Sequence, residues 1–366
     1  MGELHVAVAV LCGTVGGPAT YGKRLVAALA ARGDLRLSVL TDEPAAFAFP
    51  GIDVVALPMR GGLDRLRWQY RAVPKALRAL RPDVYHDTKN ALPFGLSVPA
   101  VVTVHDLAYH TVPDSFGFAA RAFLRWATKH AVARAAAVVV PSEATANDLR
   151  RIHPNCRDRV HVVPHGIDPA PALAAATLRE VRTRLALPER YVLHVGTVQA
   201  RKNVDLVVDG VRLLRGRGLP HRCVLVGREG WRAGRALAAI GRDPTVRWIP
   251  HASASDLAAI YALADAFVSP SAYEGFGFAV ADALAAGLPT VIADISSLPG
   301  LCGDAAVRLR DLSAPAIADA LASALADPLR TQLPARARTR AAAFSWPAAA
   351  EGHHRSYVAA TSAARR

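Results

Sequence analysis

The stretch 271–290, SAYEGFGFAVADALAAGLPT, places two acidic residues in a segment otherwise rich in Ala, Gly, Leu and Phe. Glu274 lies between the strand-like run DAFVSP (265–270) and a helical run that carries the second acid, Asp282. The N–H groups that open a helix favour an anion, and glycine lets the backbone approach a ligand closely. Ionised carboxylates accept hydrogen bonds only, so the pair suits a polyhydroxylated ligand. The alternative is that Glu274 caps the helix and Asp282 faces solvent.

Strand-like and helical runs alternate in the same way along the whole chain. Near-continuous runs of β-branched residues separated by helices predict an α/β fold with parallel sheets covered on both faces. The expected strands are 4–11, 35–40, 52–58, 83–86, 100–105, 136–141 and 159–164, followed by 190–196, 221–227, 245–250, 265–270 and 289–294. The expected helices are 18–32, 63–80, 117–134 and 143–151, followed by 202–215, 231–240, 253–263, 277–286 and 314–325.

A chain of 366 residues exceeds one comfortable core, which favours two domains. The Pro- and Ala-rich stretch HGIDPAPALAAAT (165–177) separates the two sets of strands. We therefore predict Rossmann-like domains over 1–168 and 169–345, with a C-terminal helix in 346–366 that packs back towards the first domain. Ligands of such sheets bind beyond the carboxyl ends of the strands, so the site is expected in a cleft between two facing domains.

The net charge of +14 indicates a negatively charged partner: nucleic acid, anionic lipid or a phosphorylated small molecule. The arginines are dispersed along the chain, so part of the excess is equally well explained by ordinary solvated surface. The four cysteines include no CxxC pair, which favours buried thiols in a reducing cytoplasm over a zinc site. No run of about 18 uncharged apolar residues is present, and the N-terminus is expected to be a strand, not a signal peptide.

A second group of polar residues lies in YVLHVGTVQARKN (191–203). Arg201 and Lys202 follow a strand that ends at Gly196, and they stand where the next helix begins. Two fixed cations beside helix N–H groups neutralise a pyrophosphate without a metal. The chain has no Asp-x-Asp pair of the kind that binds Mg²⁺ or Mn²⁺ beside a sugar nucleotide, so no metal site is predicted. Taken alone, the Arg–Lys pair is also compatible with a solvated helix start.

Together these motifs resemble the large family of retaining glycosyltransferases with the GT-B fold, which includes bacterial mannosyltransferases and glycogen synthase. The resemblance covers nearly the whole chain. It is carried by GGPATYGKRL (16–25), VTVHDL (102–107), VVPHGID (162–168), VGTVQARKN (195–203) and PSAYEGFGFAVADALAAGLP (270–289).

The resemblance implies roles for both acids, because the family pattern Glu-x7-Glu contacts the sugar donor. Glu274 occupies the first position, which faces the sugar, and Asp282 occupies the second, which holds ribose hydroxyls and is here one methylene shorter. Arg201 and Lys202 are implied to bind the diphosphate. The remaining implied donor contacts are Gly16, Gly17, Gly196, Thr197, Gly227, Gly275, Phe276, Gly277 and Phe278. Base contacts are expected around 226–228 and 248–253. A further departure from the family is Gly300, where relatives often carry an acid.

The first domain supplies the other implied site residues. His105 and Asp106 end a strand, and the resemblance places the histidine against the donor hexose near the reacting carbon. A structural histidine is the alternative. Lys89 and Asn90 are candidates for an acceptor pocket, together with Asp106 and with His86 at the end of the preceding strand.

A rival interpretation comes from GPATYGKR (17–24), which nearly matches the phosphate-binding pattern G-x-x-x-x-G-K-[ST]. Arg24 stands where the metal-binding hydroxyl is needed, and Pro18 removes an amide from the phosphate cradle. We therefore reject a P-loop NTPase.

The segment 63–80 combines an apolar stripe at helical spacing with five basic residues largely outside it. Such a helix can lie on an anionic membrane surface. A core-packed helix with a solvated basic face is the other interpretation, and Pro74 opposes one continuous helix.

The sequence thus predicts a retaining, metal-independent glycosyltransferase that moves a hexose-type sugar from a nucleoside-diphosphate sugar to an acceptor hydroxyl. It needs no cofactor, because the nucleotide sugar is a co-substrate. The expected partners are that donor and a small-molecule, glycan or lipid-linked acceptor, with no nucleic acid. The expected location is the cytoplasm, with peripheral contact at the inner face of the membrane as an option. The alternatives are a GT-B epimerase or phosphorylase, or a non-catalytic polyanion-binding protein.

Overall fold

The computed structural model describes residues 3–12, 17–59 and 64–364, and the chain divides into two compact units. Unit 1 comprises Met1–Leu107, Phe118–Gly166 and Phe344–Arg366, and unit 2 comprises Ala108–Gly117 and Ile167–Ala343. These divisions lie close to the boundaries expected at 168/169 and 345/346. Residues 108–117 group with unit 2, although the sequence analysis assigned them to the first domain.

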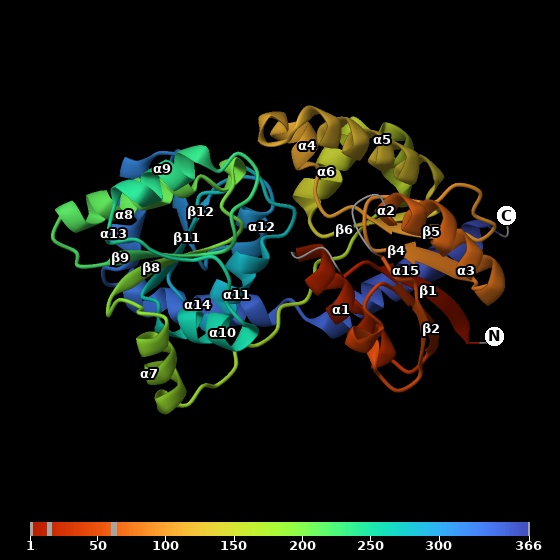
Figure 1. Ribbon diagram of the computed structural model, residues 1–366, viewed down its shortest axis with the longest axis horizontal. Helices are drawn as coiled ribbons and strands as arrows, with labels where there is room; N and C mark the ends of the chain where they lie inside the picture. Colours follow the sequence, from red (N-terminus) through yellow and green to blue (C-terminus); the bar gives the residue numbers. More distant parts are fainter. Residues whose placement is uncertain (1–2, 13–16, 60–63, 365–366) are drawn as a thin grey trace. The chain divides into compact units, whose positions relative to one another are not determined.

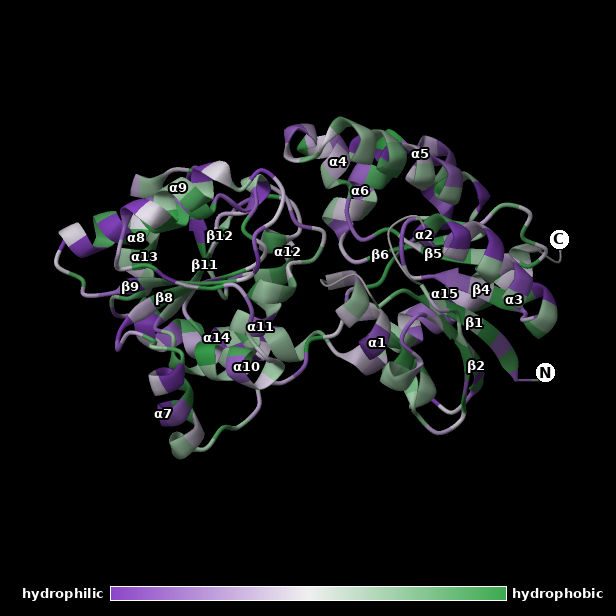
Figure 2. Ribbon diagram, viewed as in Figure 1, coloured by the Kyte–Doolittle hydropathy of each residue, from purple (hydrophilic) through white to green (hydrophobic). Residues whose placement is uncertain are grey.

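Unit 1 is built on a parallel sheet of seven strands in the order β3-β2-β1-β4-β5-β6-β7 (Figure 1). Its strands are β1 (Leu4–Val10), β2 (Leu35–Thr41), β3 (Ile52–Ala56), β4 (Val84–Asp87), β5 (Ala100–Thr103), β6 (Ala137–Val140) and β7 (Val160–Val162). The run VAVAV in β1 is buried along its length, as expected for a central strand with helices on both faces. β1 and β2 accordingly appear green in Figure 2.

Helices cover both faces of the unit 1 sheet. On one face lie α1 (Gly17–Ala30) and α15 (Trp346–Ala364), and on the other lie α3 (Val73–Leu80), α5 (Phe118–Arg134) and α6 (Glu143–Ile152). α15 packs against α1 and against strands β4 to β7, so the end of the chain completes unit 1. The smaller elements of unit 1 are η1 (Pro44–Phe47), α2 (Asp64–Arg67), the π-helical turn η2 (Trp68–Ala72) and η4 (Pro154–Arg159).

The segment predicted as a helix over 63–80 consists of α2, η2 and α3 in succession. At the π turn the Val73 N–H donates to the Trp68 carbonyl, and the next residue, Pro74, has no N–H to donate. Val73 and Leu77 are buried. The apolar residues of α3 are therefore used inside the protein, whereas Leu66 of α2 is 44% exposed, so the core-packed interpretation is confirmed for α3.

Unit 2 contains a second parallel sheet, with six strands in the order β10-β9-β8-β11-β12-β13. Its strands are β8 (Tyr191–Val195), β9 (Arg222–Val226), β10 (Arg247–Ile249), β11 (Ala266–Ser269), β12 (Thr290–Ala293) and β13 (Val307–Leu309). The connections between these parallel strands place helices on both faces of the sheet. One face carries α8 (Val204–Gly216), α9 (Gly234–Arg242) and α13 (Ala314–Ala324), and the other carries α10 (Ala254–Leu263), α11 (Phe278–Ala286) and α14 (Leu329–Ala342).

The short elements of unit 2 are α4 (Ala108–Thr111), η3 (Pro113–Ser115), α7 (Ala175–Arg184), η5 (Ala200–Lys202) and α12 (Leu298–Cys302). Strand β13 and helices α4, α7, α12 and α14 had not been predicted. All four cysteines are buried free thiols, as predicted. None of the helices in the described ranges has the length and hydropathy needed to cross a bilayer.

A buried polar network joins α15 to the rest of unit 1. The Tyr21 hydroxyl lies 2.6 Å from His353 Nε2 and 2.9 Å from Thr103 Oγ1. His86 is fully buried, with Nε2 at 2.8 Å from Thr103 Oγ1 and Nδ1 at 2.9 Å from the Tyr357 hydroxyl. Because a half-satisfied buried network is costly, these bonds fix α15 against the sheet in one arrangement.

This network makes the stability of unit 1 sensitive to acid. Burial lowers the pKa of His353 from 6.5 to about 4, so the unfolded chain takes up its proton first. The contribution of His353 is complete above pH 6.5 and is lost progressively as the pH falls towards 4, with a loss of ~2 kcal/mol at pH 5. Urea unfolding at a series of pH values, followed by a signal from unit 1, measures this loss. His353→Gln removes the titrating group, and an unchanged pH dependence in that variant would contradict the assignment.

Candidate active site

The predicted donor residues of unit 2 meet where the strand order of its sheet reverses. From β8 the chain continues to β9 and β10 on one side of the sheet. On the other side β8 neighbours β11, which is followed by β12 and β13. Arg201 and Lys202 follow β8 in the turn η5, and Glu274 follows β11. The two loops are tied together, because the Ala272 N–H donates to the Arg201 carbonyl and the Asn203 amide donates to the Pro270 carbonyl. Such a switch point is where open α/β sheets bind ligands.

Glu274 forms ion pairs with both cations. Its side chain accepts from Lys202 Nζ at one oxygen and lies 3.3 Å from Arg201 Nη1 at the other. Arg201 Nη1 also donates to the Tyr273 carbonyl at 2.7 Å, which fixes the guanidinium beside the loop. Glu274 is only 9% exposed. The structure thus brings together three of the four predicted catalytic residues.

The charge of Glu274 depends on these partners. Burial alone raises the pKa of this carboxyl, but Lys202 and Arg201 outweigh burial and lower the pKa to about 2. The carboxylate is therefore ionised at neutral pH and serves as a hydrogen-bond acceptor. With two cations and one carboxylate, the cluster retains one positive charge, which suits an anionic ligand.

Serines hold the loop of Glu274 in place. The Glu274 N–H donates to Ser296 Oγ at 2.9 Å, and Ser297 Oγ donates to the Glu274 carbonyl at 2.9 Å and to the Phe276 carbonyl at 3.1 Å. Ser296 has a left-handed backbone with φ 54°. SSLPG (296–300) had no predicted role, and the structure shows that its serines support the loop that carries the buried acid.

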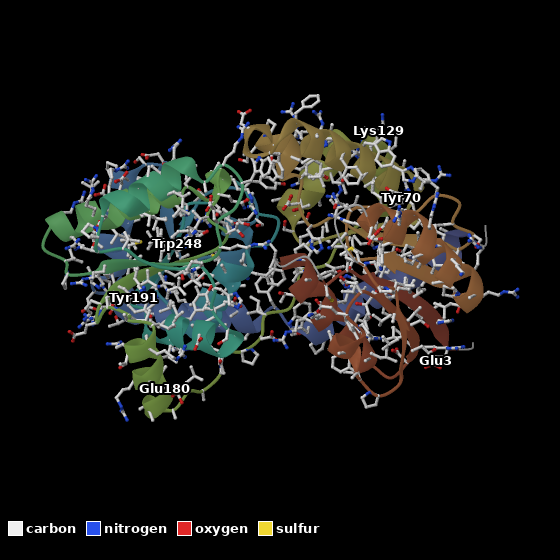
Figure 3. All side chains as sticks on the ribbon, in the orientation of Figure 1. Glu3, Tyr70, Lys129, Glu180, Tyr191 and Trp248 are labelled. Carbon is white, nitrogen blue, oxygen red and sulfur yellow. The ribbon has the colours of Figure 1, made fainter. Side chains whose placement is uncertain are left out.

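Two predicted glycines approach each other closely at the ends of β8 and β9. Gly227 has φ 142°, and a Cβ atom there would lie 2.1 Å from the Gly196 carbonyl oxygen. The Gly227 carbonyl accepts from the Trp248 indole N–H at 2.8 Å, and Trp248 is labelled in Figure 3. Thr197, the residue after Gly196, is partly buried in the same loop. No side chain other than hydrogen fits at Gly227.

The remaining predicted residues of the Gly-Phe-Gly turn shape the start of α11. Gly275 and Phe276 are buried, and the rings of Phe276 and Phe278 meet edge to face with centroids 5.3 Å apart. Gly277 has φ 97° and precedes the helix as its N-cap. Its conformation favours glycine, and a Cβ there would collide with Leu298.

Asp282 lies in the second turn of α11, and its side chain is exposed. It is close enough to the buried Tyr261 to contribute to the raised pKa of that phenol, which burial raises most. Its predicted contact with ribose stays a prediction.

The predicted residues of unit 1 have different environments. His105 follows β5, its Nε2 lies 2.8 Å from the Thr88 carbonyl, and burial lowers its pKa to about 4, so the ring is neutral. Asp106, the next residue, is partly buried. The hypothesis that His86 lines an acceptor pocket is wrong, because both ring nitrogens are bonded inside the core.

Lys89 and Asn90 follow β4. Lys89 lines a pocket beside the ends of β1 and β4. Asn90 instead donates its amide to Thr128 Oγ1 of α5 at 2.7 Å, so it positions the loop against that helix. Gly16 lies outside the described residues, and Gly17 is the first residue of α1.

Sequence reasoning missed two residues near the cluster. His194 in β8 is 1% exposed, and its Nδ1 lies 2.9 Å from the Val268 carbonyl. Burial lowers the pKa of His194 to about 4, with Lys202 and Glu274 close enough to contribute. The other is Asn203, whose left-handed backbone and amide connect the two loops. A histidine inside the strand run YVLHV was the available signal for the first. No three His, Cys, Asp or Glu side chains within the described ranges are placed to hold a metal ion.

Two family descriptions match the chain: Glycosyltransferase Family 4 over residues 15–171 and Glycosyl transferases group 1 over residues 179–345. The chain is similar to O-antigen chain mannosyltransferase B of Escherichia coli, with 27% identity over 63% of this chain and 62% of that protein. It is also similar to D-inositol 3-phosphate glycosyltransferase of Nocardia farcinica, with 31% identity over 95% of this chain and 86% of that one.

Solved structures show the same fold. The structure of Anabaena Alr3699/HepE in complex with UDP and glucose superimposes with a TM-score of 0.75 at 16% identity, over 96% of this chain and 98% of that chain. The sheets of seven and six parallel strands are those of GT-B glycosyltransferase structures, as predicted.

The close approach of Gly227 to the Gly196 carbonyl leaves no room for a larger side chain. Gly227→Ala should lower the melting temperature by several degrees, because alanine at φ 142° is strained by about 1–3 kcal/mol and its Cβ meets the Gly196 carbonyl. Gly234→Ala is the matched control, since a Cβ at that helix position meets nothing within 4 Å. Differential scanning fluorimetry of both variants makes the comparison. Equal melting temperatures for the Gly227→Ala and Gly234→Ala variants would contradict the prediction, because they would show that the loops after β8 and β9 can move apart without loss of stability.

Proposed function

The chain belongs to the GT-B glycosyltransferases described as Glycosyltransferase Family 4 and Glycosyl transferases group 1. From that premise we propose that it transfers a hexose-type sugar from a nucleoside-diphosphate sugar to an acceptor hydroxyl, with retention and without a metal. The observation that carries the proposal is the buried cluster of Glu274, Arg201 and Lys202 at the switch point of the unit 2 sheet. The UDP in the structure of the Anabaena neighbour supports a nucleotide donor.

In the proposed reaction the charged residues of this site bind different parts of the donor. The Glu274 carboxylate accepts hydrogen bonds from hydroxyl groups of the sugar, while Asp282 holds ribose hydroxyls. Negative charge grows on the β-phosphate as the nucleotide leaves, and Arg201 and Lys202 stabilise it in the transition state. These cations are already positioned by Glu274 and the Tyr273 carbonyl, so little reorganisation is needed when that charge develops.

The acceptor oxygen bonds to the anomeric carbon on the face from which the nucleotide leaves, as the bond from that carbon to the β-phosphate oxygen breaks. The acceptor proton passes to the departing phosphate oxygen, so no side chain forms a covalent intermediate. Neutral His105 contributes a hydrogen-bonding ring beside the hexose. The pKa of about 4 leaves His105 uncharged through the physiological range, so the ring acts as a neutral hydrogen-bonding group.

Removing the cations tests the donor site. A thermal-shift screen of UDP-, GDP-, ADP- and dTDP-sugars first identifies the donor, because a bound ligand raises the melting temperature. Arg201→Gln and Lys202→Met should each weaken binding of the corresponding nucleoside diphosphate by about tenfold or more, since a charge-assisted hydrogen bond contributes roughly 1.5–3 kcal/mol. Isothermal titration calorimetry measures the affinity.

Arg235→Ala is the control for this comparison, because Arg235 is exposed and pairs only at the surface with Asp205. It should bind nucleotide like the parent chain. Wild-type affinity in both Arg201→Gln and Lys202→Met would remove these residues from the donor site.

Metal independence and retention are tested in one assay of the identified donor and acceptor. EDTA should leave the initial rate unchanged within error, since fixed cations take the place of a divalent ion at the diphosphate. Proton NMR of the first product should show the anomeric configuration of the donor. A rate lost on chelation and restored by Mg²⁺ or Mn²⁺ would disprove the metal-free proposal, and an inverted anomer would disprove retention.

A further inference from the structure

Unit 1 has its own switch point, between β1 and β4, and a pocket lies there. The sheet order β3-β2-β1-β4-β5 reverses direction at this pair of strands. The pocket is lined by the carboxyl ends of both strands, and α2 and η2 supply the opposite wall. In unit 2 the equivalent position carries the Glu274 cluster. By the same rule of open α/β sheets, the pocket of unit 1 lies where a ligand is expected.

Polar groups at the base of the pocket are held in fixed positions. Asp87 is 3% exposed and accepts from the Gln69 amide and the Tyr85 hydroxyl, both at 2.8 Å, and from the Lys89 N–H at 2.9 Å. The hydroxyl of Tyr70 is buried and finds no hydrogen-bond partner among the described residues. A buried hydroxyl without a partner is costly, so it marks a place where a ligand or water completes the site.

Two cations face this pocket. Arg65 of α2 and Lys89 both line it, and burial followed by the nearby Arg65 lowers the pKa of Lys89 to about 8. Like charges held close together gain from an anion between them. Asp87 contributes one negative charge, so the lining retains a positive excess that suits a phosphate or carboxylate.

The pocket opens beside a group of exposed apolar side chains, here called the aromatic patch: Leu66, Phe94, Phe123 and Trp126. Leu66 and Phe123 also line the pocket. Trp126 is 46% exposed and Phe94 is 50% exposed, and their ring centroids lie 6.1 Å apart. The Phe123 and Trp126 rings lie 6.0 Å apart, and Phe94 stacks on Tyr70 at 5.1 Å. Exposed large apolar side chains in contact mark an interaction site.

The helix that carries Phe123 and Trp126, half of this patch, is basic. α5 contains Arg121, Arg125, Lys129 and Arg134 and no acidic residue. Lys129 and Tyr70 are both labelled on unit 1 in Figure 3. Aromatic side chains beside Lys and Arg on one helix are typical of surfaces that meet the apolar chain and the anionic head of a lipid.

We propose that this surface binds the acceptor of the transfer reaction, and that the acceptor is an anionic amphiphile. Its charged head group, of the phosphate class, enters the pocket between Arg65 and Lys89, and its apolar chain lies on the aromatic patch. This inference rests on the proposed function, because only a transferase needs an acceptor. It assigns the substrate class from the continuity of a cationic pocket with an apolar surface.

Three probes distinguish binding of the charged head group from binding of the apolar chain. Octyl phosphate, octyl β-glucoside and inorganic phosphate are titrated below their micelle concentrations into the full chain without nucleotide, by isothermal titration calorimetry. Octyl phosphate should bind at least tenfold more tightly than octyl glucoside, which lacks the charge, and than inorganic phosphate, which lacks the tail. Lys89→Met should lower the affinity for octyl phosphate to that of the parent chain for octyl glucoside. Trp126→Ala should lower the affinity for octyl phosphate to that of the parent chain for inorganic phosphate.

Two controls carry the same types of side chain outside the site. Phe118→Ala removes a residue of α5 that is 78% exposed, and Arg67→Gln removes an exposed cation paired with Asp64. Both should bind octyl phosphate like the parent chain. Equal binding of octyl phosphate and inorganic phosphate, or of octyl phosphate and octyl glucoside, would overturn the proposal. The thermal shift produced by the nucleotide sugar is measured separately on each variant, so a failure of the donor site is distinguished from a failure of the acceptor surface.

Discussion

A carboxylate that is nine-tenths buried stays ionised only if positive charge reaches it, and this requirement organises unit 2. Glu274 obtains its charge partners from a loop 72 and 73 residues earlier in the chain. Losing either partner would leave a buried charge incompletely compensated, which costs several kcal/mol in other proteins. The two loops must therefore stay together, and the backbone bonds from Ala272 and Asn203 hold them so. The same ion pairs that satisfy Glu274 also orient the cations, which gives the site its fixed positive charge before any ligand arrives.

The parallel sheets explain why the sites occur where they do. In each unit one pair of neighbouring strands sends its connections in opposite directions, and the loops at their carboxyl ends separate and leave room for a ligand. Unit 2 fills this position with a carboxylate and two cations. Unit 1 fills it with a buried aspartate, a glutamine and two cations beside apolar side chains. The same position in the two sheets thus carries different side chains, which is expected if the two units bind different molecules.

The fold was predictable from the sequence to the extent that its strands are apolar and its helices are amphipathic. β13 was missed because VRL is short and interrupted by Arg308, and α14 was missed because its buried stripe consists of Leu333, Ala337 and Ala341 among arginines, with Pro334 inside the helix. Spacing in the sequence indicated Glu274, Arg201 and Lys202 as site residues. It could not show that they form ion pairs, because contacts over 72 residues depend on the sheet order. The role proposed for His86 failed for the same reason: its partners are a threonine of β5 and a tyrosine of α15.

The distribution of charge and apolar surface bears on the net charge of +14. Many arginines form surface ion pairs, such as Arg184 with Asp256 and Arg190 with Asp265, and these contribute little to stability. α5 differs, because it has four basic residues and no acid within its own length. A solvated helix has no physical need to combine such charge with exposed Trp126 and Phe123, since apolar area in water is unfavourable by roughly 25 cal/mol per Å². The combination becomes favourable when an apolar chain covers the rings and an anion meets the cations. In α3, by contrast, Val73 and Leu77 are buried, which is the ordinary arrangement of a surface helix, and of the earlier 64–67 stretch Leu66 is exposed. The basic helices α3 and α5 therefore differ in what their apolar residues contact: α3 buries Val73 and Leu77 in the core, whereas α5 exposes Phe123 and Trp126 beside the pocket.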